Sequence, residues 1–263
     1  MTEPGPGLRR VAIGVEYDGT PYNGWQMQPH APSIQDTLND ALSQVANETV
    51  SCVGAGRTDT GVHAAGQVAH FDTAAERTPR SWLLGLNSNL PSDISVQWAI
   101  AVSDDFHARY RATSRVYRYR ILNQQARSAL EHNRAWWVRQ PLNVSAMRAA
   151  AGYFIGKHDF SAFRAAACQS KSPVRTLTRM ELSQQGAMLC FEIEANAFLH
   201  HMVRNMLGTL VRVGRGEAEP VWVRDLLATR DRKLSGMTAP AAGLTLMAVR
   251  YPAIFGLPDD QVT

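Results

Sequence analysis

Residues 56–64 read GRTDTGVHA, a short segment between two strand-like stretches at about 50–55 and 67–71. The segment holds one carboxylate, Asp59, two residues after Arg57, and its glycines allow backbone angles and close approaches that other residues resist. A nearby cation favours the ionised form of a carboxylate. An ionised carboxylate suits a nucleophile better than a proton donor, so Asp59 is a candidate catalytic residue. The simpler alternative is a tight turn in which Asp59 only caps neighbouring amides.

The stretches around this segment follow the order β-α-β-β-α-β. Apolar residues alternate with others at 11–17, as in a half-buried strand, and further strand-like stretches lie at 50–55, 67–71 and 94–102. Two helix-like stretches separate them, one that begins after Ser33 and ends near 45, and one at 80–90.

The second half of the chain repeats this order. Strand-like stretches lie at 116–122, 174–182, 189–197 and 244–250, and helix-like stretches at 145–155, 200–213 and 221–228. We therefore expect an α+β fold of two ferredoxin-like β-α-β-β-α-β halves, with antiparallel sheets, helices on one face and a catalytic cleft between the halves. The expected N-terminal half, 1–105, carries the Asp59 loop. The expected C-terminal half, 106–263, carries a strand rich in tyrosine and arginine and the helix that holds Arg204.

The composition is that of an ordinary globular protein with an unusual choice of basic residues. The 263 residues are 45% hydrophobic and 19% charged, with a net charge of +4. Only three of the 27 basic residues are lysine, and arginine matches phosphate oxygens well, although a GC-rich genome would also favour it. The three cysteines lack the spacing of a disulfide framework or a zinc site, and no apolar run reaches membrane-spanning length. A soluble, cytoplasmic protein is expected.

The densest basic region begins the second half and interleaves arginines with tyrosines. It contains Arg109, Tyr110, Arg111, Arg115, Tyr117, Arg118, Tyr119 and Arg120. Arginines contact phosphates and aromatic faces accept bases, a combination typical of surfaces that bind single-stranded nucleic acid. On a strand, Arg115, Tyr117 and Tyr119 would share one face and Arg118 and Arg120 the other. The alternative is a solvated edge strand whose tyrosines pack on the core.

The segment FLHHMVRNMLG at 198–208 places Arg204 inside an apolar stretch. A buried cation needs a partner, and Asp59 is a candidate across the expected cleft; a surface arginine that extends into solvent is the alternative. His200 and His201 are adjacent and would not share a helical face, so no metal site is predicted. The chain lacks GxSxG, GxxxxGK and a convincing GxGxxG, which argues against serine hydrolases, P-loop enzymes and dinucleotide-dependent redox enzymes.

Several long segments together resemble the tRNA pseudouridine synthase A (TruA) family. They are YDGTPYNGWQMQ from Tyr17, GRTDTGVHAAGQVAHFD from Gly56, FHARYRATSRVYRYRI from Phe106, HDFSAFRAA from His158, SPVRTL from Ser172, FLHHMVRNMLG from Phe198 and GLTLMAV from Gly243. Thr60, Arg111 and Thr245 depart from the residues usual in that family. The resemblance implies isomerisation of uridine to pseudouridine at positions 38, 39 and 40 of the tRNA anticodon stem-loop, without a cofactor, by a homodimer.

The resemblance also implies roles for individual residues. Asp59 would be the catalytic aspartate, whether it attacks the sugar or acts through a glycal-type species. Arg57 would fill the space left by the flipped nucleotide or hold its phosphate. Tyr117 would pack against the base, Arg204 would pair with the aspartate, and Leu244 would belong to the apolar wall of the pocket.

Two other functions are compatible with the same residues. Ferredoxin-like sheets with aromatic and basic side chains also occur in RNA-binding modules without catalytic activity, which would not need the Asp59 loop. A uridine isomerase that acts on a different RNA is the second alternative. Hydrolysis by paired carboxylates is disfavoured, because no second acid lies close to Asp59 in the sequence.

Overall fold

The computed structural model describes residues 7–258, and the chain divides into two compact units. Unit 1 contains the chain up to Thr113 and again from Leu246, and unit 2 contains Ser114–Thr245. The sequence suggested a division between 105 and 106, with the whole C-terminal part in the second half. In the structure, residues 106–113 lie in unit 1 because side chains of that unit hold their backbone: Arg10 donates to the carbonyl of Phe106 at 2.8 Å.

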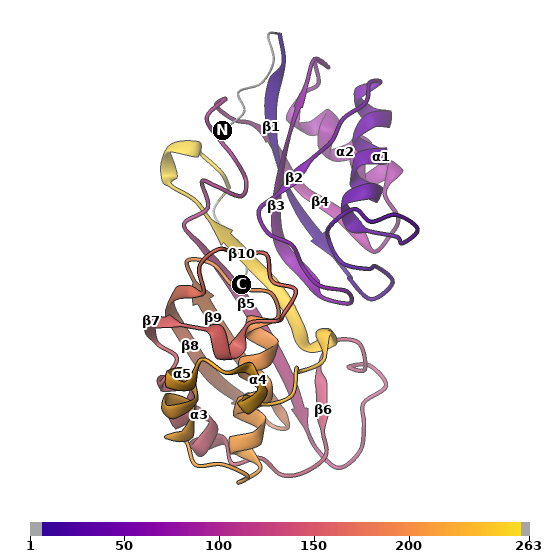
Figure 1. The fold of residues 1–263 in the computed structure, drawn as a ribbon. Helices are drawn as coiled ribbons and strands as arrows, with labels where there is room; N and C mark the ends of the chain where they lie inside the picture. Colours follow the sequence, from indigo (N-terminus) through magenta and orange to yellow (C-terminus); the bar gives the residue numbers. More distant parts are fainter. Residues whose placement is uncertain (1–6, 259–263) are drawn as a thin grey trace. The chain divides into compact units, whose positions relative to one another are not determined.

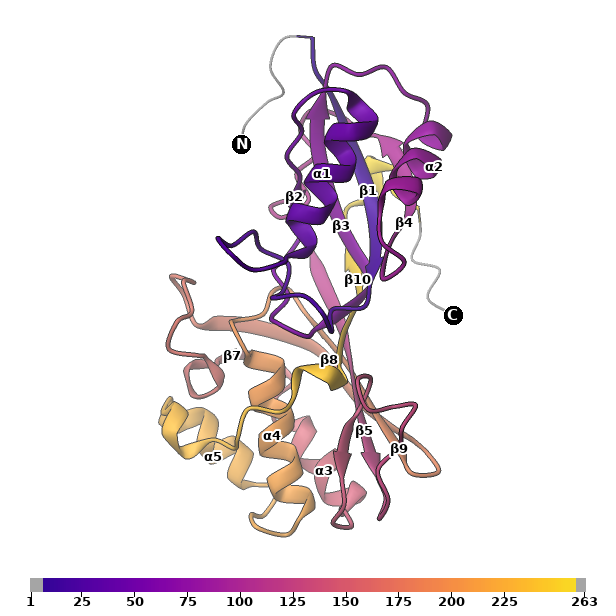
Figure 2. The same ribbon diagram turned by 90° about the vertical axis from the view of Figure 1, so that its right-hand side faces the viewer.

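Unit 1 has the predicted β-α-β-β-α-β order. Its elements are β1 (Arg9–Tyr17), α1 (Ile34–Ala46), β2 (Val53–Gly54), β3 (His63–Thr73), α2 (Pro79–Asn89) and β4 (Ile94–Ala101). The strand order β4-β1-β3, with β2 paired to β3 and all pairs antiparallel, is that of a ferredoxin-like unit. Both helices cover the same face of this sheet (Figures 1 and 2).

Local signals explain where these helices begin. Ser33 accepts a hydrogen bond from the amide of Asp36 at 3.1 Å, and its hydroxyl donates back to the Asp36 carboxylate at 2.8 Å. Thr78 caps α2 in the same way, and Pro79 occupies the first turn, where a missing amide hydrogen costs nothing. The apolar faces then pack inward, with Leu38, Leu42 and Leu86 completely buried.

In unit 2 the long strands also pair antiparallel, and helices pack on them. Its elements are β5 (Ser114–Asn123), β6 (Trp136–Val138), α3 (Val144–Gly152), β7 (Gly156–Asp159), β8 (Val174–Gln185), β9 (Met188–Ala195), α4 (Met202–Gly214) and α5 (Trp222–Thr229). The strand order is β5-β9-β8-β7. The short strand β6 is an exception to the predicted antiparallel pairing, because it runs parallel to β5. Helix α3 packs against α4 and β8.

The last strand, β10 (Leu244–Arg250), passes from unit 2 into unit 1. Within unit 1 it lies beside β3, and a Cβ atom on Gly66 would stand only 2.2 Å from the carbonyl oxygen of Met247. The predicted α+β fold is confirmed. Within residues 7–258, no helix has the length and apolar character that crossing a membrane requires.

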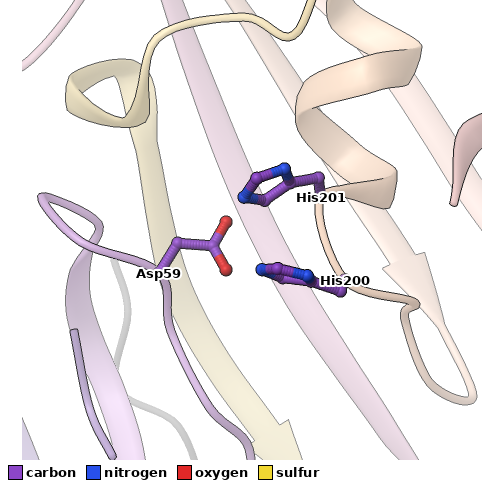
Figure 3. A group of neighbouring side chains, drawn as sticks. All are labelled: Asp59, His200 and His201. Carbon is purple, nitrogen blue, oxygen red and sulfur yellow. The ribbon is translucent and has the colours of Figure 1, made fainter. Parts of the chain in front are cut away.

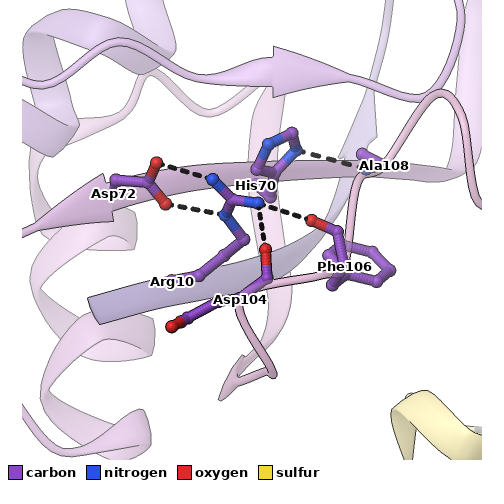
Figure 4. Close-up of polar contacts among 6 residues, drawn as sticks. All are labelled: Arg10, His70, Asp72, Asp104, Phe106 and Ala108. Carbon is purple, nitrogen blue, oxygen red and sulfur yellow. Dashed lines mark hydrogen bonds and ion pairs between the residues drawn. The ribbon is translucent and has the colours of Figure 1, made fainter. Parts of the chain in front are cut away.

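A buried polar cluster fixes the turn that follows β4 (Figure 4). Arg10 is 3% exposed and forms a two-pronged ion pair with Asp72, at 2.7 and 2.8 Å. Its third nitrogen donates to the carbonyls of Asp104 and Phe106 at 2.6 and 2.8 Å. The hydrogen bond to Asp72 raises the pKa of Arg10, so the guanidinium stays charged and the contacts stay charge-assisted.

His70 completes this cluster and makes it sensitive to acid. It is 4% exposed and accepts a hydrogen bond from the amide of Ala108 at 3.2 Å. Burial lowers the pKa of His70 from 6.5 to about 4, and the positive charges of His107 and Arg10 add to this effect while Asp72 opposes it. The folded protein therefore requires neutral His70, whereas the unfolded chain binds the proton more readily.

Acidification should consequently destabilise the fold through His70. The contribution of neutral His70 to the free energy of unfolding is fully present above pH 6.5 and is lost as the pH falls toward 4. It amounts to about 3 kcal/mol over that interval. In the His70→Asn variant, whose side-chain oxygen can still accept from Ala108, the free energy of unfolding should fall less over the same interval. Urea unfolding at several pH values measures this, and identical pH profiles for the two proteins would contradict the assignment.

Candidate active site

Asp59 lies in the loop at 55–62, which leaves β2 and enters β3 without regular secondary structure. The amide of Trp25 donates to the carbonyl of Thr58 at 3.1 Å and so fastens the loop next to Asp59. A Cβ atom on Gly24 would stand 2.5 Å from the same carbonyl oxygen, and Gly24 has a φ of +90°. Only glycine fits this conformation and this close approach. The segment around Gly24 is therefore the backbone support of the Asp59 loop.

Buried polar side chains hold the loop from behind. The amide nitrogen of Gln67 donates to the carbonyl of Gly56 at 2.8 Å and makes a longer contact of 3.5 Å with the hydroxyl of Tyr17. The hydroxyl groups of Tyr17 and Thr58 lie 2.9 Å apart. Because the Gln67 nitrogen can only donate, the Tyr17 hydroxyl is left to donate to Thr58. Burial raises the pKa of Tyr17, which keeps this hydroxyl neutral.

Arg57 and Asp59 belong to the same loop but differ in exposure. Arg57 is exposed and Asp59 is partly buried. A main-chain hydrogen bond from the amide of Val62 to the carbonyl of Asp59, at 3.1 Å, closes the turn, and Gly61 supplies the positive φ of +76° that the turn uses. The Asp59 side chain projects outward from the loop (Figure 3). Its carboxylate is thus presented by a turn that backbone bonds hold in place.

His63, at the end of this loop, has a role that the sequence did not reveal. The side chain is 5% exposed, and its Nδ1 accepts a hydrogen bond from the amide of Gly19 at 3.1 Å. A Cβ atom on Gly19 would stand 2.0 Å from the carbonyl oxygen of Val62. His63 therefore ties the turn after β1 to the loop. The sequence feature that could have indicated this role is the position of His63 in the motif GRTDTGVHA.

Tyr117 and Tyr119, which the sequence predicts to share one face of the strand β5, have different environments. Tyr119 is completely buried, and its hydroxyl donates to the carbonyl of Pro240 at 2.8 Å. Burial raises the pKa of Tyr119, and this side chain belongs to the core. Tyr117 is 9% exposed and meets the ring of Phe198 edge to face, with centroids 5.1 Å apart.

The arginines of β5 that point to the opposite face form ion pairs. Arg118 lies 2.8 Å from Glu192, and Arg120 lies 2.9 Å from Glu131. These acids come from β9 and from the segment after β5, so the local sequence, which contains no acid, did not reveal them. These ion pairs engage both guanidinium groups with carboxylates of unit 2.

Arg204 and Leu244 lie on α4 and β10. The guanidinium of Arg204 donates through Nε to the carbonyl of Ala239 at 2.8 Å, and the amide of Ala239 donates to the carbonyl of Arg204 at 3.1 Å. Leu244 is 5% exposed and directly follows Gly243, where a Cβ atom would stand 2.7 Å from the Tyr119 ring. Both residues therefore lie in closely packed parts of unit 2.

The helix predicted at 200–213 begins later than expected, at Met202. His201, which directly precedes the helix, has a φ of 60°. This left-handed conformation does not belong to an α-helix, so the helix starts only after His201. The rings of His200 and His201 lie 4.1 Å apart (Figure 3). Neither histidine lies within the helix, so helical geometry does not separate their side chains.

Asn205, in the same helix, is a further residue that the sequence analysis missed. It is completely buried and donates to the carbonyl of Phe163 at 2.8 Å. Its oxygen accepts from Arg232 at 2.9 Å and from Thr238 at 2.7 Å. One amide thus joins α4 to the segment at Phe163 and to the connection between α5 and β10, which explains a polar residue in an apolar stretch.

The sequence matches known proteins over nearly its full length. A family model described as tRNA pseudouridine synthase matches residues 13–111 and 150–252. The chain is 52% identical over 256 residues to tRNA pseudouridine synthase A of Alcanivorax borkumensis, covering 97% of this chain and 96% of that protein. It is 50% identical over 250 residues to the protein of that name from Vibrio cholerae (95% of each chain). For the Coxiella burnetii protein the identity is 48% over 251 residues (95% of this chain and 96% of that protein).

Because Gly24 lies so close to the Asp59 loop, adding a single methyl group at Gly24 should lower the stability of the protein. The Gly24→Ala variant should lower the free energy of unfolding by about 1–3 kcal/mol, because both the positive φ and the Thr58 carbonyl oppose a side chain. Gly56→Ala is the matched control within the loop, since a Cβ atom there would meet nothing within 4 Å. Urea denaturation of both variants tests this, and equal stabilities would show that the Gly24 contact is unimportant.

Proposed function

Because the chain belongs to the tRNA pseudouridine synthase family, we propose that it isomerises uridine at positions 38, 39 and 40 of the tRNA anticodon stem-loop. The family predicted from the sequence motifs is confirmed, and with it the reaction class, the conversion of uridine to pseudouridine. What we propose beyond the reaction class is the set of three target positions. The proposal is supported by the resemblance of the motifs and by the near-complete match to proteins named tRNA pseudouridine synthase A.

The reaction rearranges bonds within one nucleotide. The bond between ribose C1′ and uracil N1 breaks, the base turns, and a bond forms between C1′ and C5. The hydrogen on C5 leaves as a proton and N1 gains one, so that the atoms balance without a co-reactant. A carboxylate assists by attacking the sugar or by stabilising and deprotonating a glycal-type species.

We assign the catalytic role to Asp59. The observation that carries this assignment is its presentation: a carboxylate on a turn whose backbone is fixed by the Trp25–Thr58 and Val62–Asp59 hydrogen bonds. Fixed geometry favours catalysis, because the reacting group then needs no ordering in the transition state.

Four further residues are proposed to bind the substrate. Arg57, exposed on the same loop, would occupy the space left by the flipped nucleotide or hold its phosphate. Tyr117 would pack against the uracil, with Phe198 fixing its ring from the side. Arg204 would supply positive charge and Leu244 apolar surface.

The assembly and location of the enzyme belong to the same proposal. Because the family resemblance implies it, we propose a homodimer that acts on tRNA in the cytoplasm. Light scattering during size-exclusion chromatography would test the dimer, and a monomeric mass at micromolar concentration would count against it.

Release of tritium from tRNA labelled at uridine C5 tests the proposed function. The wild-type protein should release tritium, because isomerisation expels the C5 hydrogen whereas binding leaves it in place. The Asp59→Asn variant keeps the shape of the side chain without its charge and should lose at least about a thousandfold in rate. Circular dichroism and tRNA affinity serve as controls for folding and binding. Normal release by Asp59→Asn would refute the catalytic assignment, and no release by the wild type would refute the activity.

A further inference from the structure

Residues 230–243, the strap that connects α5 to β10, run beside α4 within unit 2 (Figure 2). A Cβ atom on Gly236 of the strap would stand only 2.6 Å from the carbonyl carbon of Gly208 in α4. The amide of Gly236 also donates to the hydroxyl of Thr209 at 3.1 Å. The two backbones therefore touch where neither carries a side chain, and the path of the strap is fixed by the helix.

The strap holds Arg204 through both the main chain and the side chain. The amide of the completely buried Ala239 donates to the carbonyl of Arg204 at 3.1 Å. In return, Nε of Arg204 donates to the carbonyl of Ala239 at 2.8 Å. Because the guanidinium group is planar, a hydrogen bond at Nε sets the direction in which its two terminal nitrogens point. The position of the Ala239 carbonyl therefore determines where the charge of Arg204 is held.

Side chains of unit 2 anchor the strap on both sides of Ala239. Before it, the hydroxyl of Thr238 donates to Oδ1 of the buried Asn205 at 2.7 Å. After it, the carbonyl of Pro240 accepts from the hydroxyl of the buried Tyr119 at 2.8 Å. The Ala239 carbonyl is thus held in place by anchors on either side.

Arg232 ties the beginning of the strap to the same buried amide. Its Nη1 donates to the hydroxyl of Ser235 at 2.6 Å and to the carbonyl of Gly236 at 3.1 Å. Its Nη2 donates to Oδ1 of Asn205 at 2.9 Å and to the hydroxyl of Thr238 at 3.0 Å. Within residues 7–258, none of its hydrogen-bond partners is an acid. The planar fork of this guanidinium therefore fastens the strap to α4.

We propose that Arg232 and Asn205 are positioning residues for the isomerisation, which hold the strap so that its Ala239 carbonyl orients the Arg204 guanidinium. The inference rests on the proposed function, in which Arg204 supplies positive charge at the substrate. In this role neither residue touches the RNA. A displacement of about 1 Å at a reacting centre lowers a rate by about a hundredfold, so even a small shift of the strap slows the chemical step.

Single-turnover tritium release, measured together with the dissociation constant for tRNA, separates positioning from binding. Arg232→Lys keeps the charge but loses the planar fork, so the rate should fall about tenfold while the dissociation constant changes by less than about twofold. Lys233→Gln removes a charge from the next residue of the strap, which is exposed, and is the matched control with an unchanged rate. Thr238→Val removes one hydroxyl of the same network at nearly constant shape and should also slow release.

A double-variant cycle shows whether Arg232 acts through Arg204. Arg204→Gln alone should slow tritium release. Adding Arg232→Lys should then slow it further by less than about twofold, because the group that the strap positions is already absent. Urea denaturation of each variant serves as the control for folding, and Thr238→Val keeps the test decisive if Arg232→Lys folds poorly.

Four results would overturn the inference. They are wild-type rates in both Arg232→Lys and Thr238→Val, a loss of tRNA affinity by Arg232→Lys with an unchanged rate, full activity of Arg204→Gln, and effects of Arg232→Lys and Arg204→Gln that multiply in the double variant. Tritium release by the wild type tests the proposed function separately. Without that release the function fails and the inference with it, whereas release by a wild type whose variants behave normally overturns the positioning alone.

Discussion

The close approach of Gly24 to the backbone of Thr58 is the constraint on which the candidate active site depends. The Asp59 loop has no strand of its own, because β2 ends at Gly54 and β3 begins only at His63. Its position is therefore set by main-chain contact with a second loop, and that contact requires a residue without a side chain. The buried hydroxyl of Tyr17 and the amide of Gln67 then fix the loop from inside unit 1.

Arginine serves two different purposes in this protein, and composition alone does not separate them. Arg10, Arg118 and Arg120 are paired with carboxylates within their own units and stabilise the packing there. Arg57 and Arg109 are exposed, one beside the candidate nucleophile and one beside an exposed tyrosine. The basic character of the chain therefore overstates the number of arginines that are available to RNA.

Most of the fold could be predicted from the sequence because its signals are local. The alternation in β9 places Leu189, Phe191 and Ile193 in the core, and the reciprocal Ser33–Asp36 hydrogen bonds mark the start of α1. The missed strands β6 and β7 are too short to show a period. The late start of α4 depends on the left-handed conformation of His201, which its neighbours in the sequence do not dictate.

The candidate site was predictable only in part, because many of its contacts join residues that lie far apart in the sequence. The motif GRTDTGVHA identified Asp59, but the partners of Arg118 and Arg120 come from distant segments, and the burial of Tyr119 depends on Pro240. The supports of the loop, Gly24 and Gln67, carry no chemical signature of their own. Long-range packing, rather than residue type, decides which of several similar side chains are available for a substrate.

Mapping of pseudouridine at single-nucleotide resolution shows directly whether the protein modifies positions 38, 39 and 40 through Asp59. An unmodified tRNA with uridine at positions 38, 39 and 40 is incubated with the protein, and pseudouridine is located by carbodiimide modification and primer extension. The wild-type protein should convert uridine at those positions, and Asp59→Asn should convert none. Conversion at other positions alone would contradict the proposed substrate site, and conversion by the variant would contradict the role of Asp59.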